Sequence, residues 1–149
     1  MFKNCLVAHV ALLALLRFSY ATITVLRPIE SSNTTMRIWP LKYDGNRIDF
    51  DPFIGEVVES SATNKTDKIV LLRNCAPPLE DRYRLFQNSG AKAIICAVAG
   101  YPGSRPGHQM YSVDGSGSSD IVVPIFSLII GELEKHWKPY EPLIVRVET

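Results

Sequence analysis

Short apolar runs separated by polar stretches dominate this chain, and they predict β-strands. Residues 22–26 (TITVL) are rich in β-branched side chains and predict a first strand, and residues 36–41 predict a short second strand near Pro40. In residues 43–53 apolar and polar positions alternate after an Asp-Gly turn signal. The polar stretches 30–35 and 59–67 are predicted to be loops between these elements.

Residues 68–98 have the clearest pattern, which is a strand, a helix and a second strand. The run 68–73 (KIVLLR) is apolar between charged ends, as is typical of a buried strand. Residues 79–89 place apolar side chains at helical spacing after two prolines, and Gly90 is suited to end that helix. Residues 91–98 (AKAIICAV) then predict a second buried strand. A strand–helix–strand unit of this length predicts a crossover between parallel strands.

The last third of the chain combines a long loop with three short elements. Residues 100–119 are rich in Gly, Ser and Pro, which predicts an extended loop. Residues 120–126 (DIVVPIF) predict a third buried strand, in which Pro124 indicates either an edge position or a break. A short helix over 131–138 and a final strand over 142–147 complete the pattern. We therefore expect an α+β fold: a small curled mixed sheet, open and barrel-like, with two flanking helices and one parallel β-α-β crossover.

These motifs resemble those of the protease-associated (PA) domain family. In that family a strand ending in Arg leads through a helix to a Gly-Ala-Lys-Ala turn and another strand, as residues 68–73 and 89–95 do here. The run 121–126, followed by a Gly-x-x-Leu motif, is similar to the family's later Ile-Pro strand and helix. The resemblance covers residues 68–138. It implies a single PA-like domain over residues 22–149, of a type understood as a non-catalytic binding region.

The segment after the first core strand departs from the family's pattern. Relatives have Arg-Gly and then Cys-x-Phe, whereas this chain has Arg73-Asn74-Cys75 followed by Ala-Pro-Pro-Leu79. Counted back from Gly90, Cys75 stands two residues earlier than the family's cysteine. No family role for a cysteine is therefore carried onto it.

The N-terminus has the layout of a secretory signal peptide. Lys3 supplies a positive start, residues 5–16 are apolar, and Ser-Tyr-Ala at 19–21 offers a cleavage site. The alternative is a membrane anchor, but a span needs about 20 apolar residues, and Arg17 interrupts this run earlier. We expect residues 1–21 to be removed and the protein to be secreted or to reside in the lumen of the endomembrane system.

The charge of the mature chain and its two glycosylation sequons are compatible with a chain that enters the secretory route. Removal of 21 residues leaves 128, with 14 basic and 15 acidic side chains and a net charge of −1. This balance does not favour a nucleic-acid partner, and no later apolar run reaches membrane length. We therefore expect no nucleic-acid partner and no membrane span in the mature chain.

Asn33 and Asn64 begin sequons in polar loops and are candidate glycosylation sites.

Two cysteines remain after cleavage, Cys75 and Cys96, and an oxidising compartment makes them a candidate disulfide. They lie in or just after strands expected to be neighbours, about 4.8 Å apart. That spacing falls inside the roughly 4.4–6.8 Å Cα separation that a disulfide accepts. The alternative is a pair of buried, unlinked thiols.

No motif supports catalysis or a resident metal. The mature chain has neither a His-Glu-x-x-His helix nor a Gly-x-Ser-x-Gly nucleophile elbow. His108, Asp114 and Asp120 share one region, but their spacing matches no known set of metal ligands. We expect no enzyme activity, no metal and no cofactor.

A binding function would use the long loop and the strand ends beside it. The candidate partner-binding residues of this loop are Tyr101, Arg105, His108, Tyr111 and Asp114. Trp137 and Tyr140 are either core or cap residues of the last elements or an aromatic anchor for a partner. Arg73, Arg82 and Arg84 are either a solvated face or a site for a peptide carboxylate. The expected ligand is a protein or peptide. The alternative is an accessory or truncated region of a larger PA-containing protease, sorting receptor or membrane-anchored ubiquitin ligase.

Overall fold

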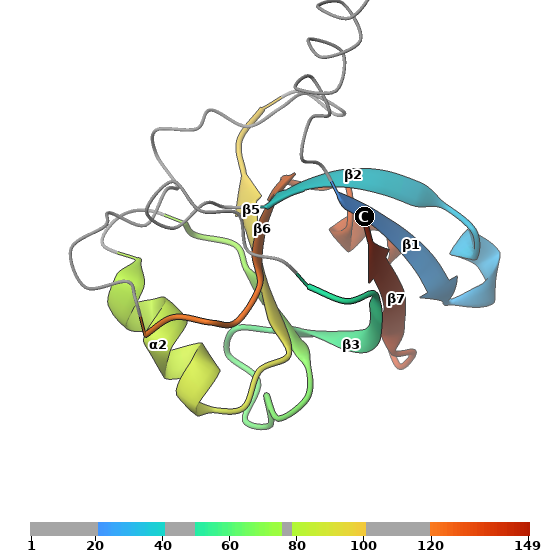
Figure 1. The fold of residues 1–149 in the computed structure, drawn as a ribbon. Helices are drawn as coiled ribbons and strands as arrows, with labels where there is room; N and C mark the ends of the chain where they lie inside the picture. Colours follow the sequence, from blue (N-terminus) through green and yellow to red (C-terminus); the bar gives the residue numbers. More distant parts are fainter. Residues whose placement is uncertain (1–20, 41–49, 76–78, 101–119) are drawn as a thin grey trace, which may run out of the picture.

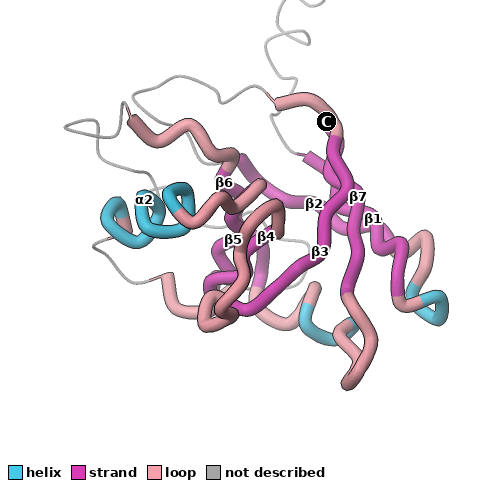
Figure 2. The backbone as a smooth tube through the Cα atoms, turned by 90° about the horizontal axis from the view of Figure 1, so that it is seen from below, coloured by secondary structure: helices cyan, strands magenta, loops and turns pink. Residues whose placement is uncertain are grey.

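A computed structural model describes residues 21–40, 50–75, 79–100 and 120–149. Within these residues seven strands form a closed barrel in the order β1-β2-β6-β5-β4-β3-β7, and one α-helix, α2, packs against its outside (Figures 1 and 2). The α-helix spans Glu80–Asn88, and two 3-10 turns cover Ile29–Ser31 and Glu134–His136. The strands are β1 (Ala21–Arg27), β2 (Thr35–Pro40), β3 (Phe53–Glu59), β4 (Ile69–Leu72), β5 (Ala93–Val98), β6 (Ile125–Ile129) and β7 (Leu143–Glu148).

The barrel has a parallel half and an antiparallel half. Strands β3, β4, β5 and β6 are parallel neighbours, while β7, β1 and β2 pair in antiparallel fashion. In the β4–β5 pair Ile69 lies opposite Ala93, and Leu72 lies opposite Cys96. Because α2 connects these two strands, the predicted parallel crossover is confirmed. The carboxyl ends of the four parallel strands consequently meet at one edge of the barrel.

The apolar residues form two separate cores, one inside the barrel and one beneath α2. Ile69 and Leu71 of β4 belong to the interior cluster, whereas Val70 and Leu72 belong to the cluster that α2 covers. Tyr83 of α2 is fully buried in that second cluster. Because both faces of the parallel strands are covered, their sequences are continuous apolar runs without alternation.

The predicted signal peptide lies outside the described residues except for Ala21. Ala21 is the first residue of β1, is fully buried, and pairs with Ile38 of β2. A cut after Ala21 would leave β1 beginning at Thr22, which pairs with Arg37. No helix in the described part of the chain is long and apolar enough to cross a membrane.

The predicted sheet is confirmed as mixed and barrel-like, but it is closed because of a strand that the sequence pattern did not predict. Strand β3 pairs with β7 on one side and β4 on the other. Its sequence contains Gly55, a residue that weakens strands. Here the glycine permits close packing, since a Cβ at Gly55 would lie 3.0 Å from the Ile69 side chain.

Strand β6 begins at Ile125 and not at residue 120 as predicted. The two amides before Pro124 are bound by a helix side chain: Gln87 Oε1 accepts hydrogen bonds from Val122 N at 2.7 Å and from Val123 N at 3.0 Å. The segment is therefore tied to α2, and its first hydrogen bond to the sheet is the one that the Pro124 carbonyl accepts from Ile94 N at 2.9 Å. Pro124 marks a break, and β6 lies inside the sheet between β2 and β5.

The predicted second helix over 131–138 is not confirmed as a flanking helix. The segment forms a 3-10 turn over Glu134–His136, preceded by Gly131 at φ 90° and followed by an extended Trp137. The Glu134 carboxylate accepts a hydrogen bond from Gly131 N at 2.7 Å. Pro139 disfavours helical backbone at the residue before it, which explains why the turn does not continue. Within the described ranges, one α-helix flanks the barrel.

Candidate functional site

The predicted partner-binding loop cannot be placed, because its residues lie outside the part of the chain that the structure describes. This holds for Tyr101, Arg105, His108, Tyr111 and Asp114.

The described residues form an open groove of about 930 Å³ near the carboxyl ends of β3 and β4. We call it the β3–β7 groove. Its lining includes Glu56, Glu59, Arg73, Trp137, Tyr140 and Glu141.

Strand ends form one wall of the β3–β7 groove. Glu59 is the last residue of β3, and Arg73 directly follows β4. The Arg73 guanidinium binds the Glu59 carboxylate through two hydrogen bonds, one of them from Nε to Oε2 at 3.1 Å. Glu56 forms an ion pair with Lys68. The charges of this wall are therefore largely paired within the chain.

The segment that leads into β7 forms the opposite wall. Trp137 is half-buried and packs against the interior core, so its interpretation as a core residue is confirmed. Tyr140, in contrast, is fully exposed and adopts a left-handed backbone with φ 67°. The prediction of a core or cap role is wrong for Tyr140. A left-handed conformation costs a residue with a Cβ roughly 1–2 kcal/mol, and the solvated ring gains no packing to offset this.

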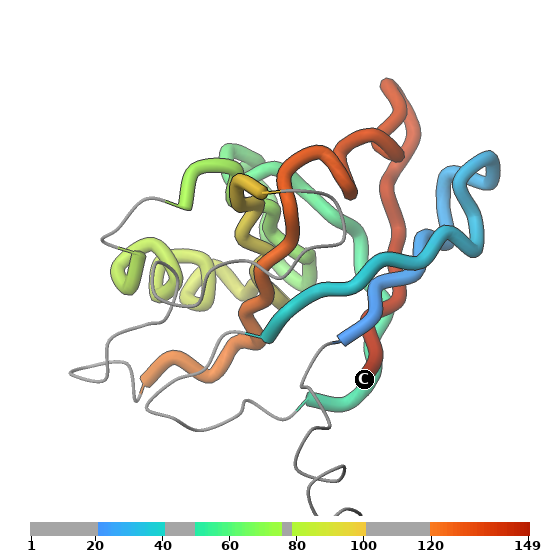
Figure 3. Tube along the Cα trace, turned by 90° about the horizontal axis from the view of Figure 1, so that it is seen from above, coloured from blue at the N-terminus to red at the C-terminus, as the bar shows by residue number. Residues whose placement is uncertain are grey.

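An ion pair joins this wall to the β1–β2 hairpin. Lys138 Nζ lies 3.5 Å from Glu30 Oε2, in the 3-10 turn between β1 and β2. Figure 3 shows the hairpin and the segment before β7 projecting from the same side of the barrel. The positive charge of Lys138 is thereby engaged away from β3 and β4.

Glu141 is the carboxylate of the groove that remains unpaired among the described residues. It follows Tyr140 and is only half-buried. The lining contains three glutamates, Glu56, Glu59 and Glu141, against two cations, Arg73 and Lys138. After the ion pairs above are counted, the groove retains a negative charge at Glu141.

The three arginines considered for a carboxylate site do not converge. Arg73 binds Glu59, and Arg82 Nη1 donates to the Asn74 carbonyl at 2.6 Å. Arg84 donates from Nε to both carboxylate oxygens of Asp120 at 2.9 and 3.1 Å. These bonds hold the pKa of Asp120 below its ordinary value. Each arginine thus has a partner within the chain.

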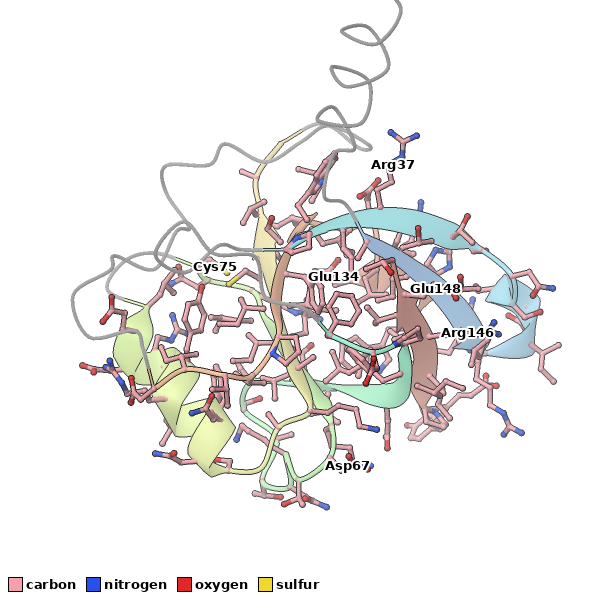
Figure 4. The ribbon with its side chains drawn as sticks, viewed as in Figure 1. Arg37, Asp67, Cys75, Glu134, Arg146 and Glu148 are labelled. Atoms are coloured by element: carbon pink, nitrogen blue, oxygen red, sulfur yellow. The ribbon has the colours of Figure 1, made fainter. Side chains whose placement is uncertain are left out.

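Cys75 and Cys96 lie side by side beneath α2, in the same apolar cluster. Figure 4 places Cys75 near the junction of helix and barrel, with Asp67 at the far end of the parallel strands. Both thiols are free and buried in this structure. The neighbouring Cys96 thiol, followed by burial, raises the pKa of Cys75, and the neighbouring Cys75 thiol is the main cause that lowers the pKa of Cys96. The disulfide stays a prediction.

Both sequon asparagines are exposed in loops. Asn33 has a left-handed backbone with φ 65° at the turn between β1 and β2. Asn64 Oδ1 accepts a hydrogen bond from Thr66 N at 3.1 Å.

In the described residues no group of three His, Cys, Asp or Glu side chains is arranged to hold a metal ion.

No protein-family model and no curated protein matches the sequence. The fold is similar to part of a solved structure, an aminopeptidase from Aneurinibacillus sp. strain AM-1, with a TM-score of 0.58 and 17% sequence identity. The match covers 87% of this chain and 30% of the aminopeptidase chain, so this chain spans less than a third of that protein. At this identity the likeness shows the fold alone: the mixed barrel with its flanking helix also occurs as part of an aminopeptidase chain.

Proposed function

We propose that this chain is a non-catalytic domain of the PA type that binds a protein or peptide partner in the β3–β7 groove. The observation that carries the proposal is Tyr140, a fully exposed aromatic ring on the rim of an open groove. Tyrosine and tryptophan supply large contact areas at protein interfaces and are enriched among the residues that dominate binding energy. Trp137 places a second aromatic side chain in the same wall.

The chemistry of the groove favours binding over catalysis. Its described lining contains neither His nor Cys, the most frequent general base and a strong nucleophile, and its arginine is held by Glu59. A general base must lie within hydrogen-bond reach of the proton that it abstracts, and a nucleophile needs such a base beside it. We therefore propose that the purified protein has no hydrolase activity. Reproducible cleavage of peptides that is lost with Cys75→Ala or with His108→Ala would contradict this.

Site-specific cross-linking tests the binding proposal. A photoreactive phenylalanine analogue in place of Tyr140 should cross-link the protein to a partner in the cells or fluid that produce it. The matched control carries the same analogue in place of Leu85, which is exposed on α2 outside the groove. Cross-linked products that are equal from both positions, or absent from both, would contradict a partner site at the groove.

We also propose that the protein enters the secretory route, because its N-terminus has the pattern of a signal peptide. Expression in a secreting eukaryotic cell should yield mature protein that begins at Thr22. N-terminal sequencing of the secreted material is the measurement, and material that begins at Met1 would contradict the proposal.

The second candidate is an accessory region of a larger peptidase, sorting receptor or ligase. The observation that favours it is the similarity of this fold to 30% of an aminopeptidase chain. Sequencing of full-length transcripts would separate the two candidates. A single reading frame that joins this domain to a catalytic domain would support the second.

A further inference from the structure

We propose that the ligand of the β3–β7 groove is a peptide segment that presents a lysine or arginine side chain to Tyr140 and Glu141. This inference rests on the proposed function and specifies the chemistry of the partner. It follows from the charges of the groove, from the exposed ring and from the closed barrel.

Charge is the first reason. Arg73 is bound to Glu59, and Lys138 lies 3.5 Å from Glu30, so neither cation of the lining is available to an incoming carboxylate. Glu141 has no ion-pair partner among the described residues. An acidic peptide would meet this uncompensated negative charge, whereas a basic side chain would neutralise it.

The aromatic residue next to Glu141 in the chain is the second reason. Tyr140 directly precedes Glu141 in the chain, and both line the groove. A lysine ammonium or arginine guanidinium placed over the face of a tyrosine ring is attracted by the ring's quadrupole. An ammonium or guanidinium between the ring and the carboxylate would gain both interactions at once. A purely apolar ligand would leave Glu141 without a partner.

The absence of an accessible strand edge at this site is the third reason. The described strands close into a barrel in which β3 is paired on both sides, with β4 and with β7. Recognition by adding a strand to a sheet needs unpaired backbone groups. Pro139 and Pro142 on the opposite wall have no amide hydrogen to donate. The ligand therefore finds no open strand edge at β3, which gives side chains such as the ring and the carboxylate the larger part in selecting it.

Peptide display tests the inference without assuming a ligand. A library of short random peptides is selected on the wild-type protein and, in parallel, on Tyr140→Asn, Glu141→Gln and Glu148→Gln. Asparagine tolerates the left-handed backbone of residue 140, so the first variant keeps the fold. Glu148 is the matched control, because it is a glutamate at the opposite end of β7 from Glu141. Circular dichroism confirms that each variant is folded before selection.

We expect the wild-type protein and Glu148→Gln to enrich peptides that contain Lys or Arg, and Tyr140→Asn and Glu141→Gln to lose them. A selected peptide should bind Glu141→Gln about two- to fivefold more weakly than the wild type, since one solvent-accessible cation–carboxylate contact is removed. Replacing its basic residue by norleucine should weaken binding to the wild type similarly.

The alternative outcomes separate this inference from the proposed function. Peptides that depend on Tyr140 but show no enrichment of Lys or Arg would overturn the inference and leave the groove as a binding site. Selection of no peptide that depends on Tyr140 would overturn both.

Discussion

Gln87, a half-buried residue, connects the helix to the segment before β6. It lies on α2, and its amide holds the segment before β6 through three hydrogen bonds. The Oε1 atom accepts from Val122 N and Val123 N, and Nε2 donates to the Asp120 carbonyl at 2.8 Å. The buried side chains of Ile121 and Val123 then complete the core beneath the helix. Truncation by Gln87→Ala removes all three bonds at once.

The stability lost in Gln87→Ala follows from the number of hydrogen bonds removed and from their partial exposure to water. A hydrogen bond within a protein contributes about 0.5–1.5 kcal/mol net, and an amide left without a partner costs more when it is buried. Three bonds give roughly 1.5–4.5 kcal/mol. Water can reach part of this segment, because Asp120 and Val122 are exposed. We therefore expect Gln87→Ala to lower the free energy of unfolding by about 2 kcal/mol, near the low end of that range.

Urea unfolding followed by tryptophan fluorescence measures this difference, since Trp39 and Trp137 both contact the folded barrel. For a domain of this size the same change corresponds to a midpoint lowered by about 8 °C on heating. Asn88→Ala is the matched control, at the next, exposed residue of α2, and should change stability by less than about 0.5 kcal/mol. If Gln87→Ala and Asn88→Ala have the same stability, the amide does not hold the segment, and the reasoning is refuted.

Three further predictions concern the thiols, the sequons and one histidine. Protein from the secretory route should contain a Cys75–Cys96 disulfide, whose loop of about 20 residues stabilises the fold by roughly 3 kcal/mol; two free thiols in denatured, unreduced protein would contradict this. Asn33→Gln and Asn64→Gln should each remove one glycan, seen as a mobility shift that glycosidase treatment reproduces. Burial, and then two neighbouring lysines, lower the pKa of His136 below its ordinary value of 6.5. The unfolded chain therefore binds the proton more readily, and stability should fall as pH drops below about 6.5; His136→Gln should remove that loss, and equal pH profiles for variant and wild type would count against it.

The parallel half of the barrel could be predicted from the sequence because its signals are local. Strands β4 and β5 are covered on one face by α2 and on the other by the barrel interior. Their sequences are therefore apolar runs, KIVLLR and AIICAV, that can be recognised in the sequence. Gly90 also ends α2 as predicted, with φ 82°. The start of β6 could not be predicted, because Gln87 belongs to a different element and acts on Val122 and Val123 through tertiary contacts.

The candidate site was harder to predict because its walls come from distant parts of the chain. Arg73 follows β4 while Tyr140 precedes β7, and only the closed barrel places both at one groove. Strand β3, which supplies Glu59, lacks the continuous apolar run that marks β4 and β5. The sequence signal that remained was local: an aromatic and an acidic residue between two prolines, Pro139 and Pro142.

Tyr140 departs from the residue preferences that the other described residues at positive φ follow. The other non-glycine residues at positive φ among those described are Asn33 and Asp67, which belong to residue types that tolerate this backbone. Tyrosine does not belong to the residue types that tolerate this backbone, and its exposed ring makes no packing contact that would offset the conformational cost. Residues that break local rules without a compensating contact are expected at functional sites. A partner that covers the ring would supply the missing contact, so Tyr140→Asn should abolish binding while leaving the domain at least as stable as the wild type.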